Sequence, residues 1–141
     1  FAHPFRGYWK DVGTVTSLWE SNMDLIDHSD QLNLSDSTWK VYSEDKGSAA
    51  QVIGENAVVS SAYIDKGAVI EGTVNHSVIS TDAVVQEGAV VTNTVLLPGV
   101  RISKNASVDF AIISENVTIG EGVQLKGTAD NILLIDRNVN K

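Results

Sequence analysis

One aspartate and one histidine are the residues of this sequence whose types and positions could take part in chemistry. Asp11 lies in a turn-rich segment and precedes Gly13, where an aspartate is typically a turn residue. His76 lies within a repeat, where a histidine could act as a general base, although the pattern favours an outward-facing polar role. His3 and His28 lie outside the repeat, so a zinc site built from several of its histidines is set aside.

The repeat around His76 covers residues 53–128 and can be counted. Apolar residues recur every 17 positions, and each unit divides into steps of five, six and six residues. The three series are Val74, Val91, Val108 and Leu125, then Ile79, Leu96 and Ile113, and then Val85, Ile102 and Ile119. An earlier unit, Val59, Ile64 and Ile70, ends on a short step of four residues to Val74.

Turn-forming residues mark the six-residue steps. Three places after the apolar position, every such step has Gly, Asn or Asp, which tolerate positive φ. These residues are Asn56, Gly67, Asp82, Gly88, Gly99, Asn105, Asn116 and Gly122. The five-residue steps have Ala62, Ser77, Thr94 and Ala111 at that place, so their turns differ in kind. The pattern predicts a three-sided coil of short strands and corner turns, whose core exists only through stacking at roughly 4.8 Å per coil.

Residues before the repeat predict one helix and a connector. Thr14 is the expected N-cap of a helix that reaches about Asp27. A short strand is expected through Tyr8 and Trp9. Residues 28–51 are polar and irregular, and we expect them to cross onto the first coil.

The apolar run at residues 132–135 is expected to pair, as a strand, with the final open edge of the coils. The three tryptophans, Trp9, Trp19 and Trp39, are expected to be packing residues where the helix meets neighbouring structure.

Composition and charge restrict the class of function. The 141 residues have a net charge of −8 and no basic run, so neither nucleic acid nor an anionic membrane surface is an expected partner. The absence of cysteine excludes disulfides and thiolate metal sites and fits a cytoplasmic protein. No apolar run approaches the length of a membrane span. Because the chain opens with Phe1 rather than Met, we interpret it as a piece of a longer protein.

Residues 7–24 read GYWKDVGTVTSLWESNMD and, together with hexapeptide coils, resemble the C-terminal part of the glucose-1-phosphate adenylyltransferase (ADP-glucose pyrophosphorylase) family. The matching motifs are Tyr8-Trp9-Lys10-Asp11-Val12-Gly13-Thr14, Asn22-Met23-Asp24-Leu25, Gly72-Thr73-Val74, His76-Ser77-Val78 and Leu97-Pro98-Gly99-Val100. The coil pattern resembles the left-handed parallel β-helix. The implied fold is all-β: a left-handed parallel β-helix of hexapeptide repeats, with one coil for each 17-position unit, preceded by one α-helix and a linker.

The resemblance also implies domains and an activity. Residues 1–27 would be the end of a nucleotidyltransferase catalytic domain, residues 28–51 a linker, and residues 52–141 the β-helix domain. That family makes ADP-glucose and pyrophosphate from ATP and glucose 1-phosphate, for glycogen or starch. By resemblance, Asp11 is a Mg²⁺ ligand that needs a partner carboxylate from elsewhere, and Trp9 lies near the sugar end of the same pocket. The family's Gly-rich loop, first metal aspartate and sugar-phosphate lysine are missing here, so these residues alone should be inactive.

Regulation and assembly are further implications of the resemblance. The β-helix domain would build subunit contacts in a homo-oligomer, or in a hetero-oligomer with a regulatory paralogue, and would help form a site for an anionic allosteric effector. Arg101, Lys104 and Lys126 could meet that effector, whereas the simpler interpretation is that they are solvated charges.

Two alternative functions remain. One is a hexapeptide acyltransferase with His76 as its base, which leaves residues 7–25 unexplained. The other is a non-catalytic regulatory paralogue of the adenylyltransferase, against which the retained Asp11 argues only mildly.

Overall fold

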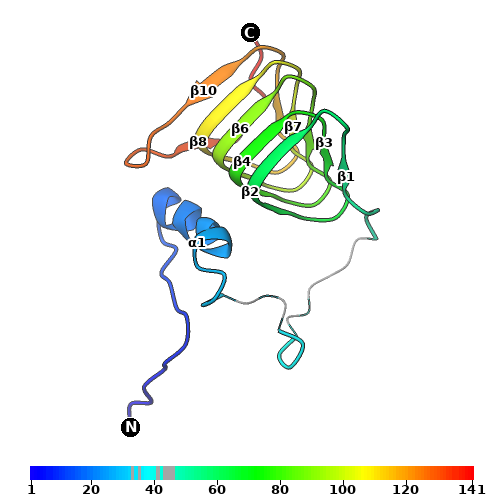
Figure 1. Cartoon of the computed structure of the whole chain (residues 1–141). Coiled ribbons are helices and arrows are strands. Elements are labelled where there is room, and N and C mark those ends of the chain that lie inside the picture. Colours follow the sequence, from blue (N-terminus) through cyan, green and yellow to red (C-terminus); the bar gives the residue numbers. More distant parts are fainter. Residues whose placement is uncertain (33, 35, 41, 43–46) are drawn as a thin grey trace.

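The computed structural model describes residues 1–32, 34, 36–40, 42 and 47–141. Within this part of the chain, one helix precedes eleven strands, and Figure 1 shows the strands stacked as a prism with the helix against one side. The elements are α1 (Val15–Asp27), β1 (Val52–Ile53), β2 (Val58–Ile64), β3 (Val69–Ile70), β4 (Thr73–Ile79), β5 (Val84–Val85), β6 (Val90–Leu96), β7 (Arg101–Ile102), β8 (Ser107–Ile113), β9 (Thr118–Ile119), β10 (Gln124–Lys126) and β11 (Leu133–Ile135).

The strands form two parallel sheets that repeat once per coil. Short strands are ordered β1-β3-β5-β7-β9, and longer strands are ordered β10-β8-β6-β4-β2. Val74 pairs with Val91, and Val91 pairs with Val108, so paired residues are separated by one unit of the sequence repeat. The same offset relates β5, β7 and β9. The predicted fold class, a parallel β-solenoid with one coil for each unit of the repeat, is therefore confirmed.

In the coils that contain β2, β4, β6 and β8, two sides come from one bent strand, whereas the sequence predicted a separate short strand for each side. The bend lies at a non-glycine residue whose φ is between 45° and 49°. These residues are Ser61, His76, Asn93 and Phe110, each directly before the place that marked a five-residue step. Because one left-handed residue turns the chain, the strand pairing continues on both sides of the bend.

The six-residue corners use the turn residues that the sequence predicted. Seven of the eight predicted positions have φ between 58° and 75°, and Asn56 is the exception. A side chain at Gly99 would collide with the side-chain amide of Asn116 on the next coil, and Gly88 has the same relation to Asn105. Glycine on one coil therefore leaves room for the asparagine of the next.

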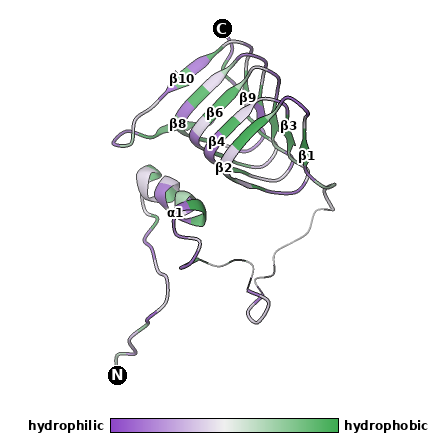
Figure 2. Ribbon diagram, viewed as in Figure 1, coloured by the Kyte–Doolittle hydropathy of each residue, from purple (hydrophilic) through white to green (hydrophobic). Residues whose placement is uncertain are grey.

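The interior of the prism is aliphatic and closed to solvent. Val91, Ile102, Ile113 and Ile119 are all 0% exposed, which confirms that they point inward. Figure 2 shows polar and apolar residues mixed along the long strands, as expected when one face is buried and the other is not. Val59 on the first coil is 38% exposed, because no further coil covers it.

The last coil is closed by the end of the chain. Strand β11 pairs in parallel with the second half of β8, which confirms the predicted pairing of the final apolar run. Val108 pairs with Leu125 at the usual repeat offset, whereas Ile113 pairs with Ile135, which lies further along the chain than that offset. The additional residues belong to a projecting loop that an isolated bridge between Thr128 and Asn131 closes.

Helix α1 begins and ends where the sequence predicted, with Thr14 as its N-cap. The strand predicted through Tyr8 and Trp9 is wrong, because this segment faces the helix rather than another strand. Trp9 and Trp39 are 77% and 79% exposed, so the prediction that they pack is wrong as well. In the described part of the 28–51 connector there is no helix or strand. Among the described residues, no helix is long and apolar enough to cross a membrane.

The stacked core predicts a cooperative effect of one buried charge. Ile102→Asp should lower the free energy of unfolding by about 3 kcal/mol or more, because its carboxylate would lie inside the aliphatic ladder without a partner. Arg101→Asp, at the exposed neighbouring position, is the matched control and should change stability little. Urea unfolding followed by circular dichroism measures both, and equal midpoints for the two variants would contradict the register.

Candidate functional site

Helix α1 packs on the outer face of the longer sheet and forms a second apolar cluster there. Met23 is 2% exposed and contacts a column of outward-facing residues, Val78, Val95 and Ile112, one from each of three successive coils. The Trp19 indole donates a hydrogen bond to the Asn93 carbonyl at 2.8 Å. The coils thus fix the helix, and the helix in turn positions the segment before it.

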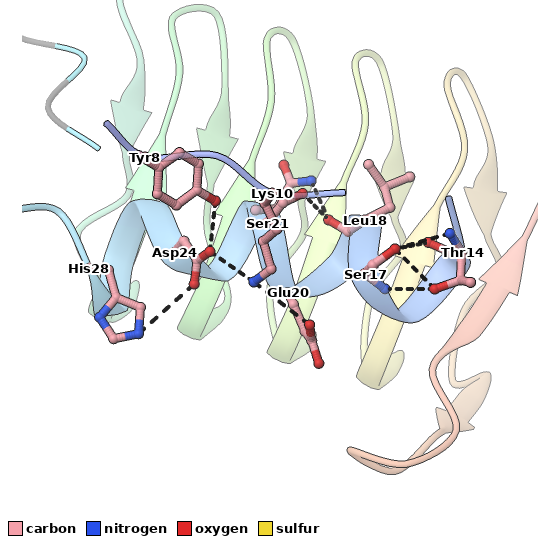
Figure 3. A network of polar contacts seen from close by, with 10 residues as sticks. Tyr8, Lys10, Thr14, Ser17, Leu18, Glu20, Ser21, Asp24 and His28 are labelled. Carbon is pink, nitrogen blue, oxygen red and sulfur yellow. Dashed lines mark hydrogen bonds and ion pairs between the residues drawn. The ribbon is translucent and has the colours of Figure 1, made fainter. Parts of the chain in front are cut away.

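The buried carboxylate of Asp24 on α1 forms hydrogen bonds with side chains of the segment before the helix (Figure 3). Asp24 is 9% exposed, and its Oδ2 accepts hydrogen bonds from the Tyr8 hydroxyl at 2.7 Å and from Lys10 Nζ at 2.8 Å. Lys10 also lies 3.7 Å from Glu20, which is half exposed. Burial acts to raise the pKa of the Asp24 carboxyl, but the hydrogen bonds from Lys10 and Tyr8 outweigh it and hold this pKa below its ordinary value. Burial and the Asp24 charge raise the pKa of Tyr8 to about 12.

Trp9 and Asp11, the two candidate site residues of this segment, are exposed to solvent rather than packed against the helix. Tyr8 and Lys10 are partly buried against the helix, whereas Trp9 is 77% exposed and Asp11 is exposed. The Asp11 Oδ1 accepts a hydrogen bond from the Gly13 N–H at 3.2 Å, which is the turn role that the sequence alone favoured. Thr14 follows at once and caps the helix by accepting from the Ser17 N–H at 3.1 Å.

The Asp11 carboxylate could supply one ligand to a hard cation. A carboxylate oxygen is a ligand that Mg²⁺ prefers, and Asp11 is exposed. Within the described residues, no group of three or more His, Asp or Glu side chains is arranged to hold a metal. Asp11 can therefore contribute one ligand, and further ligands must come from other groups.

His76 lies where helix α1 meets the bend of β4. Its Nδ1 lies 2.8 Å from Asn93 Oδ1, and its Nε2 lies 2.9 Å from Asp27 Oδ1 at the end of the helix. The Asn93 amide nitrogen donates to Asp109 at 3.0 Å, so its oxygen faces the imidazole. Both imidazole nitrogens thus face acceptors, which favours the doubly protonated ring.

This arrangement makes His76 a link between the helix and the coils. Burial acts to lower the pKa of His76, but the hydrogen bonds to Asn93 and Asp27 outweigh it and raise this pKa above its ordinary value. A general base needs a free lone pair, whereas both nitrogens here are engaged. The geometry therefore favours the structural role over the acyltransferase base.

The three cations considered for an effector do not lie on one sheet. Arg101 is on β7 of the short-strand sheet, and Lys126 is on β10 of the long-strand sheet. Lys104 forms an exposed ion pair with Glu87 at 3.6 Å. Two hollows of about 260 and 330 Å³ lie at corner turns of the coils, and neither is lined by Trp9 or Asp11.

Sequence reasoning gave no role to Asp24, Asp27 or Asn93. At 100° per residue, Asp24 lies on the side of α1 opposite the apolar residues Val15, Trp19 and Ile26, where a solvated charge is expected, so the helical spacing did not mark it. The bonds of Asp27 and Asn93 to His76 join residues 49 and 17 positions apart in the chain, and no local pattern marks the longer of the two contacts.

The His76 link predicts a pH-dependent docking of α1. Because the folded-state pKa of His76 is raised, its stabilisation is complete below about pH 6.5, the ordinary histidine value, and is lost as the pH rises through the folded-state pKa. The pair is partly exposed, so the loss should be about 1 kcal/mol or less.

Unfolding free energies of the wild type and of His76→Gln, measured from pH 5.5 to 8.5, test this prediction. The difference between them should shrink at the alkaline end, and His3→Gln is the control for an exposed histidine. A difference that stays constant over this range would contradict it.

Comparison with known proteins places the chain in a family. The family model described as GlmU-like, C-terminal hexapeptide, matches residues 47–131. The glucose-1-phosphate adenylyltransferases of Bacillus mycoides (strain KBAB4) and Bacillus cereus (strain ATCC 10987 / NRS 248) are each 43% identical over 136 residues. These matches cover 95% of this chain and 36% of each relative, so the chain spans about a third of the length of the curated relatives it matches. The chain belongs to the GlmU-like, C-terminal hexapeptide family.

Proposed function

We propose that this chain is the C-terminal part of a glucose-1-phosphate adenylyltransferase, which makes ADP-glucose and pyrophosphate from ATP and glucose 1-phosphate. The observation that carries the proposal is that the similarity to such enzymes covers 95% of the chain and so extends well outside the coils. A protein that shares only the hexapeptide coils would be similar to this chain over the coils alone, whereas here the similarity also includes the segment that contains Trp9 and Asp11.

In this proposal, Asp11 supplies one of the carboxylates that hold Mg²⁺. When bound, Mg²⁺ would supply charge neutralisation at the reacting phosphates. Asp11 contributes a charged oxygen in a fixed turn, since Gly13 holds its other oxygen and Thr14 begins the helix directly afterwards. Trp9, exposed on the same segment, offers an aromatic surface for the sugar end of the pocket. The remaining ligands and the nucleotide loop would come from a catalytic domain that precedes these residues.

The coil domain has the surface that subunit contacts require. Val52, Ile53, Val58 and Tyr63 on the first coil are between 41% and 60% exposed, and β1 and β2 are the end strands of their sheets. Exposed apolar side chains beside open strand edges are typical of interaction surfaces. These edges support a homo-oligomer or a hetero-oligomer, which we include in the proposal. Control by an anionic effector and a cytoplasmic location are further parts of the proposal that rest on the family resemblance alone.

The Asp11 assignment is tested in the longer enzyme that contains this chain. Asp11→Asn should lower turnover by orders of magnitude, because a charged ligand of Mg²⁺ is lost where electrostatic stabilisation dominates. The melting temperature of this variant should match that of the wild type. Asp11 is exposed, and the side-chain amide oxygen of the asparagine can still accept the hydrogen bond from the Gly13 N–H.

The 141 residues alone should form no ADP-glucose from ATP and glucose 1-phosphate, with or without Mg²⁺. Near-normal turnover of Asp11→Asn would show that Asp11 is not a ligand of Mg²⁺ in the reaction. ADP-glucose formation by the isolated chain would overturn the domain assignment.

A further inference from the structure

We propose that Asp24 is a positioning residue that holds the segment of residues 8–11 in one orientation, so that Trp9 and Asp11 face the reaction site. The inference rests on the proposed function and adds to it a residue that touches neither metal nor substrate. Asp24 would act only through Tyr8 and Lys10.

Asp24 is held in place by the helix on which it lies. It follows Met23, which is 2% exposed in the cluster between α1 and the coils, and the Asp24 residue is 9% exposed. A carboxylate at such a position is stable only when its charge is paired, and both donors that reach its Oδ2 come from the preceding segment.

The segment of residues 8–11 has few other polar contacts to hold it. In the described chain, the backbone of residues 1–12 makes no backbone–backbone hydrogen bond with any other residue. The side-chain bonds of Tyr8 and Lys10 are therefore its specific polar anchors on the helix, at 2.7 and 2.8 Å. Two anchors separated by one residue fix the rotation of an extended chain as well as its position, whereas a single anchor would let it turn.

The two anchors also determine where Trp9 and Asp11 lie. In an extended segment, alternate side chains point to opposite sides, so anchoring Tyr8 and Lys10 directs Trp9 away from the helix (Figure 3 shows the two anchors). Asp11 lies between the anchor at Lys10 and the N-cap Thr14, which are both fixed on α1. Only three residues span that interval, so the Asp11 carboxylate has little freedom to move.

Asp24→Asn tests the proposal in two settings. In the 141-residue chain, the NMR order parameters of the backbone amides of residues 8–12 should fall, while those of β4, β6 and β8 stay unchanged. In the longer enzyme, turnover should fall by about 10- to 100-fold and the Mg²⁺ concentration for half-maximal rate should rise, as expected when a residue that orients a ligand is lost. The KM for ATP should change much less than kcat.

Two further variants make the result decisive. Glu20→Gln removes the other carboxylate near Lys10, which is 3.7 Å away and half exposed, and should leave the order parameters and turnover unchanged. If Asp24→Asn lowers the melting temperature of the coils, Tyr8→Phe replaces it, because it removes one anchor without altering the helix. Tyr8→Phe should then show the same fall in the order parameters of residues 8–12 and a smaller loss of turnover.

Asp11→Asn separates failure of this inference from failure of the proposed function. If Asp11→Asn is inactive while Asp24→Asn matches the wild type in order parameters, turnover and Mg²⁺ dependence, the positioning role is wrong and the metal role stands. If Asp11→Asn retains turnover, the proposed function fails. If Asp24→Asn slows turnover with unchanged order parameters and Mg²⁺ dependence, the positioning role is likewise wrong.

Discussion

A coil of this protein can bury its aliphatic residues only against the coils next to it. Val74, Val91 and Val108 form one column, and each is 0% exposed because a neighbour in register covers it. Register therefore depends on the corners, where Gly99 leaves room for Asn116 and the φ values are positive. The rest of the structure depends on this ladder, since a slipped coil would also displace the outward-facing residues.

The outer face of the same strands supports the candidate site. Val78, Val95 and Ile112 form a second column, on which Met23 of α1 packs. Asp24, the next residue, then holds Tyr8 and Lys10, and these direct Trp9 and Asp11 outward. The exposed Asp11 carboxylate is thus positioned by a series of contacts, from the stacked coils to α1 and from α1 to the segment that contains Asp11.

The repeat could be predicted from the sequence because its signal is periodic, and the same holds for the helix from Thr14 to Asp27. The docking of that helix could not, because its contacts join distant residues, as when Trp19 donates to Asn93 across 74 positions. The bent strands were missed for a related reason: residues such as Phe110 do not favour positive φ, so no local preference marks the bend. The segment predicted as a strand is held by side-chain bonds to one buried aspartate, which strand patterns do not encode.

The positions of Trp9 and Asp11 depend above all on the coils holding α1 in place. Nuclear Overhauser contacts in the 141-residue chain measure this directly, between the Met23 methyl group and the methyl groups of Val95 and Ile112. Strong cross-peaks are expected there if the coils hold the helix. The indole N–H of Trp19 should also exchange slowly with solvent, because it donates a hydrogen bond to the Asn93 carbonyl. A helix without these cross-peaks, while the pairings of β4, β6 and β8 are intact, would contradict the account.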